Sequence, residues 1–382
     1  MRIVRGTAIV LSMCATVGVG CRRQEPAAEP DDLPVAEASS TLVELTDGQK
    51  AAIDAITAAG GEIDLDGSGL PVRIDLATER TFADESLVRA VLLFPELKSL
   101  RLTLNSVPET TLAELAALTQ LEELFLQDGA IDDASFRDVL TAMPNVRRLT
   151  LRRINGVTDE SFSAVSDCPN LEVVALIEMN ELTGAGLEPF AKLQRLRALD
   201  LRNCGRLTPE DLKRLAAFSN LSELKLGGPA INDQIADLIV SLPNVTSLAV
   251  EDAEISAAFI ERLASDKATA DRLRMLAFAR CFGVTDDALL SIDKFTNLEA
   301  LSLRDIMVSG EFLTSLSKVD KGPLPLRSLT ATNAFVDDAV IQCLPTLAPN
   351  LERLDLRGNP GITDESKQVF VKLQNLSEIK RD

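Results

Sequence analysis

The chain has 382 residues, of which 46% are hydrophobic and 25% are charged, a composition typical of a globular protein with ample material for a core. It contains no histidine, which excludes Ser-His-Asp and Cys-His catalysis, histidine metal sites and histidine-based pH sensing. The net charge of −19 disfavours contact with nucleic acid or anionic lipid.

The first twenty residues have the composition of an export signal. Residues 1–5 are a short basic region, and residues 6–20 are an apolar run too short to span a membrane comfortably. The run ends in Val-Gly-Val-Gly before Cys21, which resembles a bacterial lipoprotein signal, although Gly18 departs from the leucine that this family prefers. The resemblance implies lipidation at Cys21 and anchoring to the cell-envelope membrane through the lipid alone, on the periplasmic or cell-surface side. Ordinary secretion is the alternative.

Residues 21–41, which follow this signal peptide, predict a lipidated cysteine and a disordered tether. They are rich in proline, alanine and acidic residues, and they cannot supply a packed core. A tether after a lipid-anchored cysteine would hold a folded domain away from the membrane.

Residues 42–70 predict an N-terminal cap made of a helix and a hairpin. Thr46 and Gln49 have the spacing of a capping box, an alanine-rich run follows to about Ala59, and two glycines end it. Residues 64–75 then have two interpretations. Their acidic spacing matches a calcium loop except that the twelfth position is aspartate, whereas the alternation over residues 72–76 favours a hairpin turn between two strands.

One pattern recurs from residue 71 to residue 382. The motif L-x-x-L-x-L returns at intervals of 24 to 28 residues, mostly 25, with first positions at Leu97, Leu121, Val146, Leu171, Leu196, Leu221, Val245, Leu273, Leu298, Leu326, Leu351 and Leu376. In the copy over residues 349–373, Leu354 and Leu356 point to the same side of a strand. Asn359 can satisfy buried backbone groups at a corner, and Thr363 can cap a helix. One such unit cannot bury its own apolar face and needs neighbours.

These motifs resemble the leucine-rich-repeat family, in its cysteine-containing type, and residues 195–218 are the closest match. Cys204 stands at the cysteine position of that type, and Cys281 repeats it. The resemblance implies an α/β fold, a right-handed solenoid of about twelve repeats with a curved parallel sheet on the concave face and helices on the convex face. The family's usual role is protein–protein interaction. Cys168, Cys204, Cys281 and Cys343 are predicted to be buried and unpaired.

Acidic residues follow Thr158, Thr208, Thr285 and Thr363, where the helices are expected to begin. Paired carboxylates could support acid–base chemistry, but threonine caps with acids at the helix N-terminus explain the pattern without it. The two longest intervals have extra residues at 265–270 and 319–325, which predict loops at one edge of the solenoid.

The outward strand positions contain one unusual group. Val173, Ala175 and Ile177 place three apolar side chains on one repeat, and Arg148, Arg152 and Arg202 flank them. Arginine beside exposed apolar groups is typical of a protein-binding hot spot, and the basic groups favour an acidic partner locally. The candidate partner-binding residues are Arg101, Phe125, Arg148, Arg152, Val173, Ile177 and Arg202. An ordinary solvated sheet face is the alternative.

The sequence therefore predicts a non-catalytic protein-binding module displayed at the bacterial cell envelope. It is expected to be a monomer with no cofactor, no metal and no nucleic-acid partner, and its protein partner is unknown. Two alternatives remain: a carboxylate-dependent hydrolase of envelope polymers, and a purely structural envelope spacer.

Overall fold

The structure is a computed structural model that describes residues 43–81, 83–319 and 322–382. Residues 42–382 form one compact unit. The signal peptide, Cys21 and the tether lie outside the described residues, so the expectations about them stay predictions. No helix of the described residues is long and apolar enough to cross a membrane.

A helix and a hairpin form the N-terminal end of this unit. Helix α1 spans Asp47–Ala58 and begins with the expected capping box, in which the Thr46 hydroxyl accepts a hydrogen bond from Gln49 N and the Gln49 side chain accepts one from Thr46 N. Strands β1 (Glu62–Leu65) and β2 (Pro71–Leu76) pair antiparallel, which confirms the hairpin interpretation. The Asp66 carboxylate accepts hydrogen bonds from the amides of Ser68 and Leu70, so it holds the turn.

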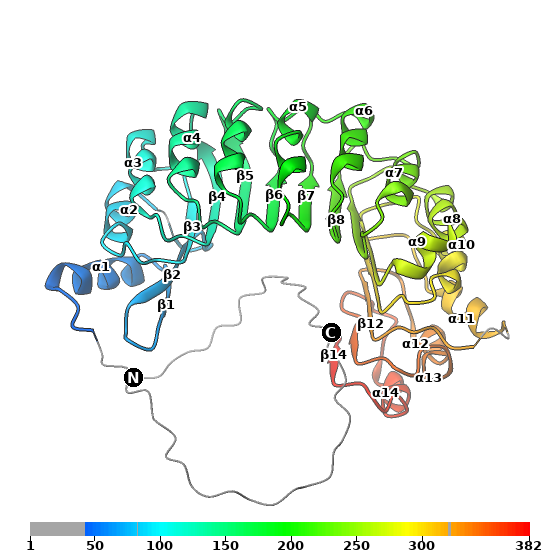
Figure 1. Cartoon of the computed structure of the whole chain (residues 1–382). Coiled ribbons are helices and arrows are strands. Elements are labelled where there is room, and N and C mark those ends of the chain that lie inside the picture. The colour runs from blue at the N-terminus through cyan, green and yellow to red at the C-terminus, as the bar shows by residue number, and fades with distance from the viewer. Residues whose placement is uncertain (1–42, 82, 320–321) are drawn as a thin grey trace, which may run out of the picture. The chain divides into compact units, whose positions relative to one another are not determined.

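The strands of the described residues form one sheet of fourteen, in chain order. After β2, each strand pairs parallel with the next, as the crossover through an outer helix requires. The later strands are β3 (Ser99–Thr103), β4 (Glu123–Ala130), β5 (Arg148–Asn155), β6 (Val173–Ile177), β7 (Ala198–Arg202), β8 (Glu223–Gly227), β9 (Ser247–Glu251), β10 (Met275–Ala279), β11 (Ala300–Arg304), β12 (Ser328–Thr332), β13 (Arg353–Asp355) and β14 (Glu378–Lys380). The predicted α/β solenoid is confirmed: strands line the inner side of the curve and helices the outer side (Figure 1).

The register places the second leucines of the motifs in one buried row. This row consists of Leu100, Leu124, Leu149, Val174, Leu199, Leu224, Leu248, Leu276, Leu301, Leu329, Leu354 and Ile379. The side chains from Leu100 to Leu354 in it are 2% exposed or less. Because side chains alternate along a strand, the residues on either side of this row must point out of the concave face.

Short helices cover the convex side. The α-helices are α2 (Glu85–Val91), α3 (Glu109–Ala113), α4 (Asp133–Thr141), α5 (Gly184–Leu187), α6 (Pro209–Leu212), α7 (Ile235–Ser241), α8 (Ala257–Ser265), α9 (Lys267–Arg272), α10 (Asp286–Leu289), α11 (Glu311–Ser317), α12 (Asp338–Ile341), α13 (Leu344–Leu347) and α14 (Lys367–Phe370). The 3₁₀ turns are η1 (Glu114–Ala117), η2 (Ser161–Asp167), η3 (Phe190–Lys192), η4 (Lys213–Ala217), η5 (Leu290–Lys294) and η6 (Asp364–Ser366). Beneath them, Phe162 packs against Phe136 and Phe190, with ring centroids 6.4 and 5.2 Å apart.

The prediction of a loop at residues 265–270 is wrong. The Asp266 side chain caps a further helix, α9, by accepting a hydrogen bond from Thr269 N. The Arg272 guanidinium then donates to the carbonyl of Ile239 in the preceding repeat and to that of Val245 at the start of its own repeat. The extra residues therefore add a helix anchored to its neighbour.

Several acidic residues at the helix starts form hydrogen bonds to the next repeat, in addition to any capping of their own helix. Thr208 and Thr363 cap as expected, but the Thr285 side chain makes no capping hydrogen bond. One aspartate in each of several repeats accepts hydrogen bonds from the backbone N–H and hydroxyl of a threonine or serine in the next repeat. These pairs are Asp133–Thr158, Asp159–Thr183, Asp233–Ser256, Asp286–Ser309 and Asp338–Thr363.

In three repeats the corner residue after the strand, Cys204, Cys281 or Asn359, also donates to a carbonyl of the previous repeat. Asn359 is 3% exposed; its Nδ2 donates to Ala331 O at 2.6 Å, and its Oδ1 accepts from Ala334 N and Val336 N at 3.1 Å each. The prediction that Asn359 satisfies buried backbone groups is therefore confirmed. At the equivalent position the Cys204 thiol donates to Leu176 O at 3.0 Å. Burial raises the pKa of the Cys204 thiol to about 12, which keeps it protonated as a donor.

We expect Asn359→Ala to lower the free energy of unfolding by about 3 kcal/mol, because it leaves buried backbone donors and acceptors unpaired. Asn359→Cys should lower it less, since a thiol can still donate to Ala331 O, as Cys204 does to Leu176 O. Urea unfolding followed by circular dichroism is the suitable measurement, because the chain has no tryptophan or tyrosine. The exposed Asn375→Ala is the control, and an equal loss in all three variants would contradict the assignment.

Candidate functional site: the concave face

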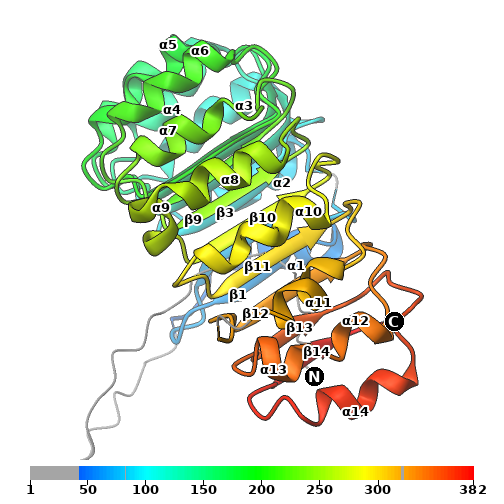
Figure 2. The ribbon, with the colours of Figure 1, turned by 90° about the vertical axis from the view of Figure 1, so that its right-hand side faces the viewer.

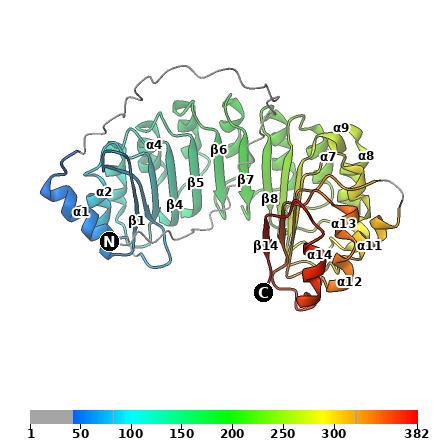
Figure 3. The ribbon, with the colours of Figure 1, turned by 90° about the horizontal axis from the view of Figure 1, so that it is seen from below.

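The concave face contains the predicted binding residues, which lie on β3 to β7, and Figure 3 shows β4 to β7 side by side. The register places Arg148 beside Val173 and Arg152 beside Ile177 on β5 and β6. Val173 and Ile177 are half-buried, whereas Ala175 between them is only 9% exposed. Because the sheet is concave, outward side chains crowd together and cover the small Ala175. The exposed apolar surface of β6 therefore consists of Val173 and Ile177.

Arg148 is the exposed cation of this group. It has no ion pair and no side-chain hydrogen bond within the part of the chain that the structure describes. A free guanidinium on a rigid strand beside apolar groups can pair with a carboxylate or stack on an aromatic ring of a partner.

The other three predicted arginines already have partners in the chain. Arg152 donates through Nε and Nη2 to Glu178 at 3.1 Å. Arg101 lies 2.9 Å from Asp75 and places its guanidinium 3.7 Å from the centre of the Phe125 ring. The structure thus brings Arg101 and Phe125 together, but on the neighbouring repeats β3 and β4, away from Val173. The expectation of an acidic partner therefore applies only to Arg148, because the charges of Arg101, Arg152 and Arg202 are already paired within the protein.

Arg202 is the most strongly held of the set. Its guanidinium pairs with Asp200 at 2.8 Å and with Glu251 at 2.6 Å, across the gap left by Gly227 on β8. Burial opposes its charge, but the hydrogen bond and charge of Asp200, with those of Glu251, outweigh burial and raise the pKa of Arg202. Arg202 therefore stabilises the sheet and is not available to a partner.

A column of residues with positive φ borders the concave face, and sequence reasoning missed it. The residue after the strand core is left-handed in each repeat from β4 to β13: Asp128, Arg153, Glu178, Asn203, Gly228, Asp252, Arg280, Asp305, Asn333 and Gly358. The conformation lets the amide donate to the next strand, as Glu178 N does to Arg202 O at 2.9 Å and Asn203 N to Gly227 O at 3.0 Å. The recurrence of Asp, Asn, Gly and charged residues at one position of each repeat was the available signal.

The side chains of this column form two ion-pair clusters. Arg153 lies between Asp128 and Glu178, at 2.5 and 3.2 Å. Arg280 pairs with Asp252 at 2.6 Å and also contacts Glu251. Burial opposes ionisation of Glu251, yet the hydrogen bond and charge of Arg202, followed by Arg280, lower the pKa of this carboxyl. Most charge along this edge is thus neutralised within the protein.

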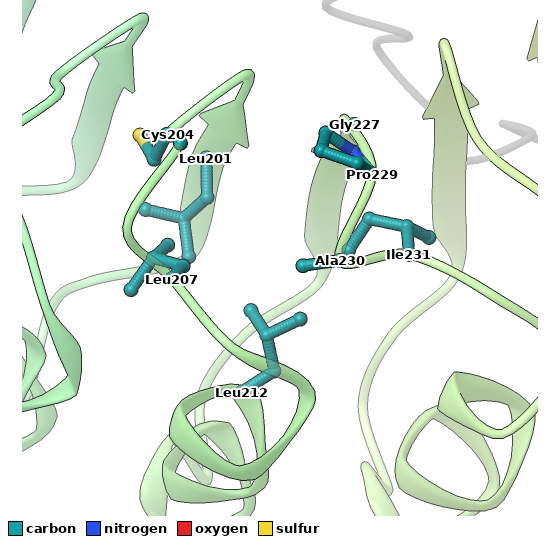
Figure 4. A pocket seen from close by; sticks show the side chains of 9 residues that line it. Leu201, Cys204, Leu207, Leu212, Gly227, Pro229, Ala230 and Ile231 are labelled. Carbon is teal, nitrogen blue, oxygen red and sulfur yellow. The ribbon is translucent and has the colours of Figure 1, made fainter.

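Two hollows are too small or too open for enclosed chemistry. The one in Figure 4 has a volume of about 10 Å³, room for at most one water, and it is lined by apolar groups such as Leu201, Cys204 and Ile231. The other, of about 200 Å³, is polar and lies at β2–β4, where Thr78, Thr103 and Gln127 line it. No group of three or more acidic or cysteine side chains could hold a metal ion in the described ranges.

Comparisons with known proteins agree with this architecture. A family model described as Leucine Rich repeat matches residues 348–366. A yeast structure of Rad7 in complex with Elc1 superposes with a TM-score of 0.54 at 19% identity, covering 74% of this chain and 75% of that one. An internalin (inlF) of Listeria monocytogenes gives a TM-score of 0.39 at 16% identity, covering 87% of this chain and 89% of that one.

One curated relative also matches. It is EEED8.10 of Caenorhabditis elegans, named as a candidate RNA-binding protein, and it is 23% identical over 209 residues. The match covers 53% of this chain but only 28% of that protein. At 19% identity the likeness to the Rad7 structure shows the fold alone, a leucine-rich-repeat solenoid, and not a shared activity.

We expect Glu251→Gln to lower the free energy of unfolding at pH 7 by about 2 kcal/mol, because it removes the charge that Arg202 and Arg280 share. The folded pKa of Glu251 lies below its ordinary value of 4.5, so its contribution is present above pH 4.5 and is lost as the pH falls through the folded pKa. The difference between parent and variant should therefore shrink below pH 4.5.

Denaturant unfolding between pH 3 and pH 7 measures this difference. The control is Glu181→Gln, which breaks an exposed pair with Arg206 and should change stability by less than about 0.5 kcal/mol. A Glu251→Gln effect that is independent of pH would contradict the assignment.

Proposed function

We propose that this leucine-rich-repeat solenoid is a non-catalytic protein-binding module that holds its partner on the concave face around Arg148. The observation that carries the proposal is the exposed guanidinium of Arg148, which has no partner among the described residues and lies beside the half-buried Val173 and Ile177, where the neighbouring Arg152 is paired. Stability does not require this arrangement, and it has the composition of a binding hot spot.

The partner should present a carboxylate and an apolar or aromatic group to β5 and β6. Arg152 and Glu178, which form an ion pair with no net charge, would border the contact with the partner. The name of the C. elegans protein raises RNA as an alternative, but a net charge of −19 opposes phosphate contacts.

The first test is a pull-down from envelope extract of the source organism with residues 43–382, in parallel with Arg148→Glu. We expect a specific protein to be retained by the parent and lost by the variant, because the change turns attraction of a carboxylate into repulsion. Arg353→Glu is the matched control, since Arg353 is exposed, has no ion pair among the described residues, and occupies the equivalent position on β13.

Retention that is equal for Arg148→Glu and Arg353→Glu would contradict a site at Arg148. No specific retention by the parent would favour the spacer, and turnover of envelope polymers abolished by a single acid-to-amide change would favour the hydrolase.

We also propose that the module is displayed at the cell envelope through a lipid on Cys21. The support for this is the basic and apolar segment before Cys21 and the acidic, proline-rich segment after it. Cys21→Ala should move the protein from the membrane pellet to the soluble fraction, as measured by immunoblot after ultracentrifugation. Unchanged membrane association in this variant would contradict the anchor, and Cys14→Ala is the control.

A further inference from the structure

Three large apolar side chains stand exposed at one position of three successive repeats. Phe282, Met307 and Phe335 are 68%, 57% and 67% exposed. Each lies seven residues after Met275, Ala300 and Ser328, which the sheet register aligns, so the three occupy equivalent places just beyond β10, β11 and β12. These strands and their helices lie side by side in Figure 2. We call the three side chains the apolar stripe.

The fold does not need large apolar groups at this position. The other repeats hold small or polar residues there: Ser106, Ala130, Asn155, Asn180, Gly205, Ala230, Glu254 and Pro360. Phe335 moreover has a φ of 31°, a value that a bulky residue rarely adopts. Exposed aromatic side chains that packing does not explain, one of them on a strained backbone, indicate a contact surface.

The surface beside the stripe is acidic. Glu254, Asp287 and Glu311 are exposed, and their side chains have no hydrogen bond or ion pair in the described part of the chain. Arg280, two residues before Phe282, is paired with Asp252 and Glu251. Arg304 is an unpaired cation among the described residues, but it ends β11 on the concave side. The edge of the solenoid where the helices begin therefore carries the apolar stripe together with carboxylates that have no partner among the described residues.

We propose that the apolar stripe docks an amphipathic helix of a partner protein, whose apolar residues at i, i+3 or i+4 and i+7 are flanked by lysine or arginine. Such a helix spans about 10.5 Å over seven residues, and three neighbouring repeats span about 9.6 Å at the spacing of strands. Basic flanks complement the free carboxylates. The same carboxylates repel an anionic lipid surface and a second copy of this acidic chain. This surface is distinct from the concave face and does not depend on the function proposed there.

The test is a titration of labelled model peptides with residues 43–382, which form one compact unit, followed by fluorescence anisotropy. The probe is a helical peptide of about 18 residues, made of leucine and lysine with the leucines on one face. Two further peptides replace every lysine by glutamate, or keep the composition and scatter the leucines around the helix. Only the first peptide should bind.

The stripe variant is Phe282→Asn, Met307→Asn and Phe335→Asn combined, which installs the residue that Asn155 and Asn180 already provide. It keeps every charge, so electrostatic attraction of the lysine peptide is unchanged, and its affinity should fall roughly tenfold or more. The matched control combines Leu65→Asn, Leu93→Asn and Val371→Asn, three exposed apolar residues elsewhere, and should bind like the parent. Circular dichroism establishes that all proteins are folded.

Hydrogen exchange locates the contact, and protection is expected at residues 279–287, 304–311 and 332–338. Equal binding by parent and stripe variant, equal binding of the scattered peptide, or protection confined to the concave strands would overturn the proposal. A dimer in sedimentation that the stripe variant abolishes would assign the surface to a second copy instead. Absence of binding by the lysine peptide to the parent would reject a basic helix as the occupant.

Discussion

No repeat of this protein can bury its own leucines, and the rest of the structure depends on that constraint. The second leucine of each motif is covered only because the next strand aligns with it, in a row from Leu100 to Leu354. This alignment sets the strand register, and the register sets which side chains face outward and which repeats share an edge. The concave columns and the apolar stripe are both consequences of it.

The edges of the solenoid show how the repeats remain joined beyond the leucines. A non-glycine residue in the left-handed region costs about 1 kcal/mol or more, and one additional backbone hydrogen bond returns about the same. The two terms nearly cancel. The ion pairs around Arg153 and Arg280 add further contacts between repeats on that edge. On the opposite side of each turn, aspartates such as Asp133 bind the next repeat through Thr158. Each repeat is thus held by its neighbour at several points that are independent of the core.

Sequence reasoning predicted the features that arise from periodicity, and it missed those that depend on contacts across repeats. The solenoid and the hairpin arise within one repeat or from its regular return. The role of Asn359 was predicted from its place at a corner, but its partners in the previous repeat were not. The partner of Arg152, Glu178, lies 26 residues away, and the second partner of Arg202, Glu251, lies 49 residues away. A pair of that kind depends on side-chain conformations that no spacing rule gives. The burial of Ala175 similarly depends on the curvature of the sheet. Helix α9 was missed because the length of an interval between repeats does not show whether its three extra residues form a helix or a loop.

Charged side chains that are paired within the protein stabilise the solenoid, whereas those without an internal partner mark the candidate binding surfaces. Among the described residues, Arg148 has no internal partner beside the apolar groups of the concave face, and Glu254, Asp287 and Glu311 have none beside the apolar stripe. The two surfaces therefore have opposite charge preferences, and a partner segment of one sign that fits the first would be repelled by the second. Two different segments are required to occupy both. A curved solenoid suits two separate binding surfaces. The strand register that exposes Arg148 on the concave face also aligns the residues just beyond the strand ends, where the apolar stripe lies.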